Sequence, residues 1–117
     1  MPDLLHQKRA AYAARLQESL DRLITKLSAL EEVERLSLVG SYARGRADLF
    51  TDLDILVIMR TELSWPERLC QLYGLLALPV DLDLFCYTPE EFAALRERPF
   101  LKNLLQKEVV LYERKAP

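Results

Sequence analysis

The sequence is poor in the residues from which many catalytic sites are built. It contains a single histidine, His6, close to the start of the chain, so a histidine general base is not expected. Its two cysteines, Cys70 and Cys86, lack the spacing of a zinc knuckle or a redox pair and read as reduced thiols. Any proton transfer in an active site would therefore fall to carboxylates.

An excess of positive charge and a long apolar run are also missing. The formal net charge is -2, so no overall positive field attracts nucleic acid, and a long nucleic-acid partner is not expected. No signal peptide is recognisable, and the longest apolar segment, Leu53–Met59, is too short to span a bilayer. The sequence therefore predicts a soluble, cytoplasmic protein without a membrane partner.

Length and composition predict one globular domain. The chain has 117 residues, of which 50% are hydrophobic and 29% are charged, and it shows no repeat, linker or low-complexity segment. We expect a single domain over residues 1–117, with an N-terminal helix over residues 1–30 and a core over residues 33–112.

The pattern of apolar residues predicts alternating helices and strands. Leucines recur with a helical period between Leu4 and Leu30, which predicts one long amphipathic helix. Capping boxes at Ser64 and Thr88 predict helices to about Ala77 and Arg96. The remaining expected elements are strands at Leu36–Val39, Leu53–Met59, Val80–Tyr87 and Val109–Tyr112, and a helix over Phe100–Lys107. This order indicates an α/β (α+β) fold, with a mixed β-sheet and helices packed on it.

Two of the expected strands carry an Asp-x-Asp segment. Asp52 and Asp54 share one face of their strand, and Asp81 and Asp83 repeat the arrangement on the next. Carboxylates at close range repel one another unless a divalent cation or an arginine lies between them. Oxygen ligands fit Mg²⁺ or Mn²⁺, and two such ions about 4 Å apart stabilise an in-line phosphoryl displacement. The pattern therefore indicates a site for metal-assisted phosphate chemistry.

A glycine–serine step ends the first expected strand. Gly40 permits a sharp turn and a close ligand approach, Ser41 offers a hydroxyl to a phosphate oxygen, and Arg44 and Arg46 add two cations. Taken alone, Gly-Ser is a common turn, Asp-x-Asp is often a solvated strand end, and two arginines are surface charges. The combination, with ten residues between Ser41 and Asp52, has few accidental matches.

This combination resembles the signature of the DNA polymerase beta nucleotidyltransferase superfamily. Its specific part is Gly40–Ser41, ten residues, then Asp52-Leu53-Asp54, supported by the segment "DLFCYTPEEF" from Asp83. The resemblance extends over Leu36–Tyr112, and the short length is similar to the minimal nucleotidyltransferase branch. It implies the polymerase beta-like palm fold.

The resemblance also implies roles for individual residues. Asp52 and Asp54 would ligate the catalytic metals, and a third carboxylate would bind one metal and activate the acceptor hydroxyl. We expect Asp83 to be that carboxylate, because its distance to the next helix matches the family pattern, and keep Asp81 as the alternative. The implied nucleotide-binding residues are Gly40 and Ser41, with Arg44 and Arg46 beside them.

The implied activity is the Mg²⁺-dependent transfer of a nucleoside monophosphate, AMP above all, from a nucleoside triphosphate to a hydroxyl. The chain has no room for an acceptor-gripping domain, so the core, a second copy or a partner protein must meet the acceptor. Minimal members of the family are typically paired with a small helical HEPN protein as antitoxin and toxin. The expectation is an antitoxin that adenylylates its HEPN partner. The alternative is a non-catalytic antitoxin or regulator that masks the partner by contact.

Overall fold

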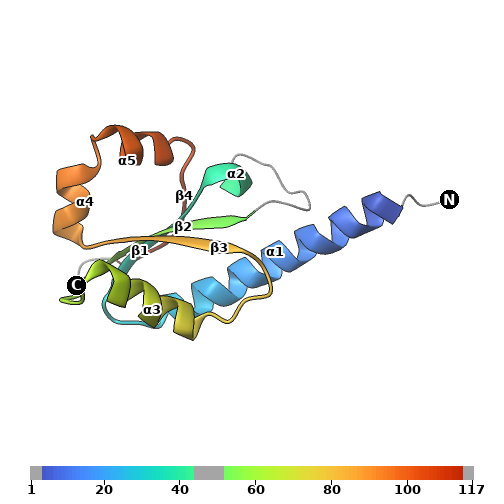
Figure 1. The fold of residues 1–117 in the computed structure, drawn as a ribbon, viewed down its shortest axis with the longest axis horizontal. Helices are drawn as coiled ribbons and strands as arrows, with labels where there is room; N and C mark the ends of the chain where they lie inside the picture. The colour runs from blue at the N-terminus through green and yellow to red at the C-terminus, as the bar shows by residue number, and fades with distance from the viewer. Residues whose placement is uncertain (1–3, 44–51, 115–117) are drawn as a thin grey trace.

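The computed structural model describes residues 4–43 and 52–114, and its centre is one four-stranded sheet (Figure 1). The strands are β1 (Val33–Val39), β2 (Leu53–Met59), β3 (Leu82–Tyr87) and β4 (Val109–Glu113), in the spatial order β3-β2-β1-β4. Strand β1 is antiparallel to both β2 and β4, whereas β2 and β3 are parallel. The predicted mixed sheet is therefore confirmed.

Helices cover both faces of this sheet. Helices α1 (Leu4–Ser28) and α3 (Trp65–Leu75) lie on one face, and α4 (Pro89–Leu95) and α5 (Pro99–Leu104) lie on the other (Figure 1). A four-residue helix, α2 (Gly40–Ala43), follows β1 directly. The beginning of α1 extends away from the rest of the molecule.

Strand β2 explains the near-continuous apolar run in the sequence. Leu53, Ile55, Val57 and Met59 belong to the core formed with α1 and α3, whereas Leu56 and Ile58 pack with Phe92 and Leu101 of α4 and α5. A strand that is covered on both faces needs apolar side chains at successive positions. Asp54 is the exception within this run, and it points to the same face as Leu56.

Two strands begin at residues other than those predicted. Strand β1 begins at Val33 rather than Leu36, although Glu34 and Arg35 are charged. Arg35 is accommodated because its guanidinium forms a 2.6 Å ion pair with Glu108 and lies over the Phe92 ring. Strand β3 begins at Leu82 rather than Val80, because the chain still bends after Pro79.

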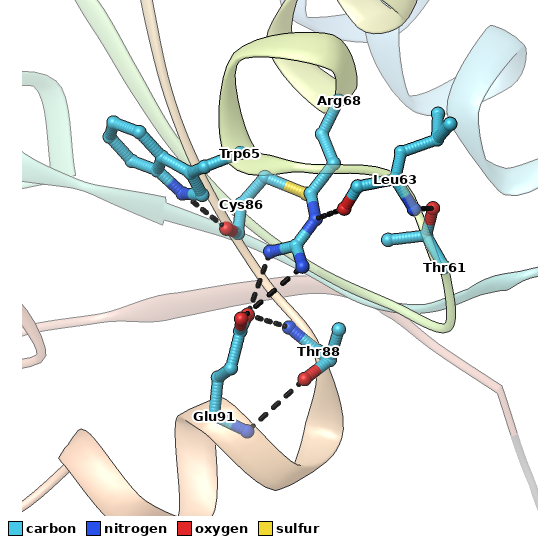
Figure 2. A network of polar contacts seen from close by, with 7 residues as sticks. All are labelled: Thr61, Leu63, Trp65, Arg68, Cys86, Thr88 and Glu91. Atoms are coloured by element: carbon cyan, nitrogen blue, oxygen red, sulfur yellow. Dashed lines mark hydrogen bonds and ion pairs between the residues drawn. The ribbon is translucent and has the colours of Figure 1, made fainter.

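The starts of α3 and α4 are joined by a network of polar contacts (Figure 2). The Glu91 carboxylate accepts hydrogen bonds from the Thr88 amide at 2.8 Å and from the Arg68 guanidinium at 2.7 and 3.2 Å. Arg68 also donates to the Leu63 carbonyl, and the Trp65 indole donates to the Cys86 carbonyl at 2.8 Å. The predicted capping glutamate of α4 therefore also neutralises a buried arginine.

None of the helices in residues 4–43 and 52–114 is long and apolar enough to cross a membrane.

Candidate functional site

The parallel register of β2 and β3 brings the two Asp-x-Asp segments side by side. Asp54 is the register partner of Asp83, and the Leu53 amide donates to the Asp81 carbonyl at 3.0 Å. Asp52 and Asp81 therefore lie together where the two strands begin, and Asp54 and Asp83 lie one step further along. Since register partners on adjacent strands point to the same face, four carboxylates gather at one end of the sheet.

The carboxylates perturb one another. Burial raises the pKa of Asp54 to about 6, with further contributions from the charges of Asp83 and Asp52 and from a hydrogen bond with Asp83. Burial also raises the pKa of Asp52, as do the charges of Asp81 and Asp83 and a hydrogen bond with Asp81. The site thus consists of two pairs set by the register of β2 and β3, Asp54 beside Asp83 and, one step earlier, Asp52 beside Asp81.

No cation within the described residues balances this charge. The ion pairs found there join Arg35 to Glu108 and Arg68 to Glu91, and neither involves one of the four aspartates. Arg44 and Arg46, the two cations expected beside the site, lie outside the described residues. A concentration of like charge with raised pKa values is typical of functional sites, because nothing in folding alone favours it.

Gly40 connects β1 to this cluster. Its φ is +74°, a backbone conformation that L side chains rarely adopt. A Cβ atom built on Gly40 would overlap the Asp54 carboxylate and lie 2.9 Å from its Cγ atom. Both the backbone and the available space therefore require glycine here, and the first turn of α2 begins directly against the acidic side chains. Ser41 lies in that turn, but the position of its side chain is not among those described.

The donor chemistry of the cluster fits a hard cation such as Mg²⁺ or Mn²⁺, because every candidate ligand atom is a carboxylate oxygen. The geometry, however, is that of two pairs. Within the described part of the chain, no three acidic, histidine or cysteine side chains already form a set that could hold a metal ion. A metal bound here would have to draw the pairs together by side-chain rotation.

The sequence had predicted this cluster only in part. Asp81 was the alternative to Asp83 as third carboxylate, yet the structure gives each of them a partner on β2. The signal for this double pairing was the repeated Asp-x-Asp spacing on two strands. Helix α2 was not predicted, because four residues are too few to show a helical period.

Fold and site together define a small α+β domain with an acidic centre on parallel strands. The sequence model of the nucleotidyltransferase domain family matches residues 20–116, and the chain belongs to this family. The resemblance to the nucleotidyltransferase superfamily is thereby confirmed. No curated protein sequence matches the chain.

Three similar solved structures share the fold. A proposed nucleotidyltransferase from Sulfolobus solfataricus is 16% identical, with a TM-score of 0.57, 97% of this chain covered and 91% of that one. A tyrosine-to-alanine mutant of the toxin–antitoxin MntA-HpeT is 22% identical, with a TM-score of 0.53 and coverages of 85% and 73%. A toxin–antitoxin with AMP-PNP is 18% identical, with a TM-score of 0.50 and coverages of 85% and 74%. At these identities the likenesses show a shared fold.

Proposed function

We propose that the protein transfers a nucleoside monophosphate, AMP, from a nucleoside triphosphate to a hydroxyl group on a partner protein, and does so with Mg²⁺. The observation that carries the proposal is the register of β2 and β3, which sets Asp54 beside Asp83, with Gly40 against Asp54. This arrangement offers oxygen ligands directly beside the Gly40–Ser41 turn, the expected contact of the triphosphate.

Three of the four aspartates have a part in this reaction, and Asp81 remains the alternative to Asp83. Asp52, Asp54 and Asp83 would hold the metal, which when bound neutralises the charge that develops on the phosphates. Gly40 makes room for the Asp54 carboxylate at the end of β1, and Gly40, Ser41, Arg44 and Arg46 remain the expected contacts of the triphosphate.

The reaction is a displacement at the α-phosphorus. The acceptor oxygen forms a bond to this phosphorus while the bond to the bridging oxygen breaks, and pyrophosphate leaves with the electron pair. A proton must leave the acceptor hydroxyl, and a carboxylate is the base at hand. Asp83 is exposed and next to Asp54, so its carboxylate can orient the hydroxyl and accept that proton.

The choice of adenosine nucleotide and protein partner draws on the fold likeness. Two of the similar structures are toxin–antitoxin proteins, and one of them was solved with AMP-PNP. Their identity to this chain is low, so they support the proposal without assigning it. We propose that the partner is a small helical HEPN protein, with the present chain as its antitoxin.

The test is a transfer assay with ATP labelled on the α-phosphate, Mg²⁺ and the purified protein encoded by the neighbouring gene. We expect label on the neighbour with the unaltered protein, and a loss of roughly a thousandfold with Asp54→Asn. Glu62→Gln is the control, because Glu62 is an exposed carboxylate that follows the end of β2 opposite to Asp54, and its activity should be unchanged. Equal labelling by Asp54→Asn and the unaltered protein would refute the proposal.

A second function is favoured by the absence, among the described residues, of three side chains already placed to hold a metal. In that case the protein masks its partner by contact alone. The same assay separates the two, because a mask silences the partner equally well as the unaltered protein and as Asp54→Asn, with no label transferred.

A further inference from the structure

The junction of α4 and α5 exposes an aromatic ring between two basic side chains. Phe100, in the first turn of α5, is 59% exposed. Arg98, the residue that caps α5, and Lys102, one turn later, are also exposed. Neither forms an ion pair with any residue in the described part of the chain. Arg98, Phe100 and Lys102 are called the α5 corner below.

The α5 corner is connected to the acidic cluster by one further ring. Phe100 contacts Phe85 of β3, with ring centroids 5.9 Å apart and planes tilted by 51°. Phe85 follows Asp83 by two residues on the same strand, so the two side chains share a face and lie about 7 Å apart along it. A protein that packs against the rings of Phe85 and Phe100 would therefore also lie over Asp83.

The corner lies on the side of the cluster from which an acceptor would come. In the order β3-β2-β1, Gly40 follows β1, Asp54 is on β2 and Asp83 is on β3. A triphosphate at Gly40 occupies the β1 side, which leaves the β3 side to the acceptor hydroxyl. Phe85 shares its strand face with Asp83 and contacts Phe100, so the α5 corner lies on the β3 side of the cluster.

The chemistry of the corner indicates a protein partner. Residues 96–102 contain three basic residues and one acidic one, in a chain with a net charge of -2. An exposed aromatic side chain beside arginine is the composition of an interface centre, because the ring buries a large apolar area and the cations pair with opposite charge. The complementary surface would be an apolar pocket for Phe100 within an acidic rim.

We infer that the α5 corner is the surface on which the acceptor protein docks, with Phe100 as its apolar anchor and Arg98 and Lys102 as contacts to acidic side chains. The inference rests on the proposed function, because it locates the acceptor relative to Asp83. It adds a binding surface that the transfer chemistry alone does not require.

The experiment measures binding of the neighbouring gene's protein by calorimetry, without nucleotide, for Phe100→Ala and for the double variant Arg98→Glu/Lys102→Glu. We expect each to raise Kd about tenfold or more, and the double variant to reduce the salt dependence of Kd. The matched controls are Leu4→Ala and Lys8→Glu/Arg9→Glu at the exposed start of α1, which should change Kd less than about twofold. Circular dichroism checks that each variant is folded.

The outcomes separate the docking surface from the transfer reaction. Unchanged Kd in both corner variants, or no binding by the unaltered protein, overturns the inference. Tighter binding of a labelled single-stranded RNA oligonucleotide than of the neighbour, lost with Phe100→Ala, overturns it in favour of nucleic acid. If the corner variants lose binding while the unaltered protein binds the neighbour but transfers no label, the docking surface is supported and the proposed function is refuted. If the unaltered protein transfers label and Phe100→Ala has an unchanged KM for the neighbour, the proposed function is supported and the docking surface is refuted.

Discussion

Like charges gather at the beginning of strand β3, whereas opposite charges form an ion pair after its end. At its beginning, Asp83 lies beside Asp54, and no basic side chain in the described residues forms an ion pair with either carboxylate. After its end, the buried Arg68 is held by both carboxylate oxygens of Glu91 (Figure 2). Paired charge at one end stabilises the fold, whereas like charge at the other opposes it. The difference marks the beginning of β3 as the end shaped for a ligand.

The largest predicted effect comes from breaking the paired end. Glu91→Gln removes the charge opposite Arg68, whose exposed fraction is only 6%. A buried guanidinium left without its partner is strongly unfavourable, so we expect the free energy of unfolding to fall by about 2–4 kcal/mol. Chemical denaturation measures it. The control is Glu90→Gln, an exposed neighbour in the same helical turn, which should change stability by less than about 0.5 kcal/mol. Equal small effects would show that the pair contributes nothing.

Gly40→Ala tests the close contact at the acidic end. Alanine is strained at a φ of +74°, and its Cβ atom would overlap the Asp54 carboxylate. We expect a loss of about 1–3 kcal/mol in stability and a large loss of transfer activity, since Asp54 must move. The same substitution at Gly74 in α3, where a Cβ atom meets nothing within 4 Å, is the control. Gly74→Ala should stabilise the helix by about 0.5–1 kcal/mol. Unchanged stability and activity in Gly40→Ala would mean that the end of β1 and Asp54 can shift to accept the methyl group.

Asp54→Asn tests whether the acidic end opposes folding in a metal-free buffer with a chelator. The folded protein holds the pKa of Asp54 near 6, above its ordinary value of 3.8, so the contribution of Asp54 to stability is most favourable below pH 3.8 and is lost as the pH rises through 6. Asparagine removes that penalty. We therefore expect Asp54→Asn to be more stable than the unaltered protein by about 1–2 kcal/mol at pH 8, allowing for solvent screening, and equal to it at pH 3.5.

Thermal unfolding at the two pH values makes this comparison, with Asp21→Asn on α1 as the control. A constant difference between pH 3.5 and pH 8 would contradict the titration of Asp54. Mg²⁺ should stabilise the unaltered protein at pH 8 and leave Asp54→Asn nearly unaffected, because binding to the folded state alone raises its stability.

The sequence was sufficient for the sheet but not for the arrangement of its charges. Strand β2 was predicted at its observed bounds because its buried apolar residues form an unbroken run, and Thr88 and Glu91 showed where α4 begins. The repeated Asp-x-Asp spacing indicated carboxylates on two strands, but the pairing of Asp52 with Asp81 depends on the parallel register of β2 and β3, which no local pattern encodes. Likewise, the ion pair between Arg68 and the capping Glu91 joins two helices, although each residue had a local explanation of its own.

The smallest predicted effect concerns the edge of β3 that is not paired with β2. This edge runs between the acidic cluster and the Arg68–Glu91 ion pair. The Tyr73 hydroxyl donates to the Leu82 carbonyl at 3.0 Å and accepts from the Leu84 amide at 3.1 Å, on either side of Asp83. Tyr73→Phe removes both hydrogen bonds and should lower stability by about 1 kcal/mol. The exchange rate of the Leu84 amide hydrogen, followed by NMR, should rise about fivefold. Tyr87→Phe is the control, since its hydroxyl makes no hydrogen bond within the described residues. An unchanged Leu84 exchange rate would show that Tyr73 does not hold the strand that positions Asp83.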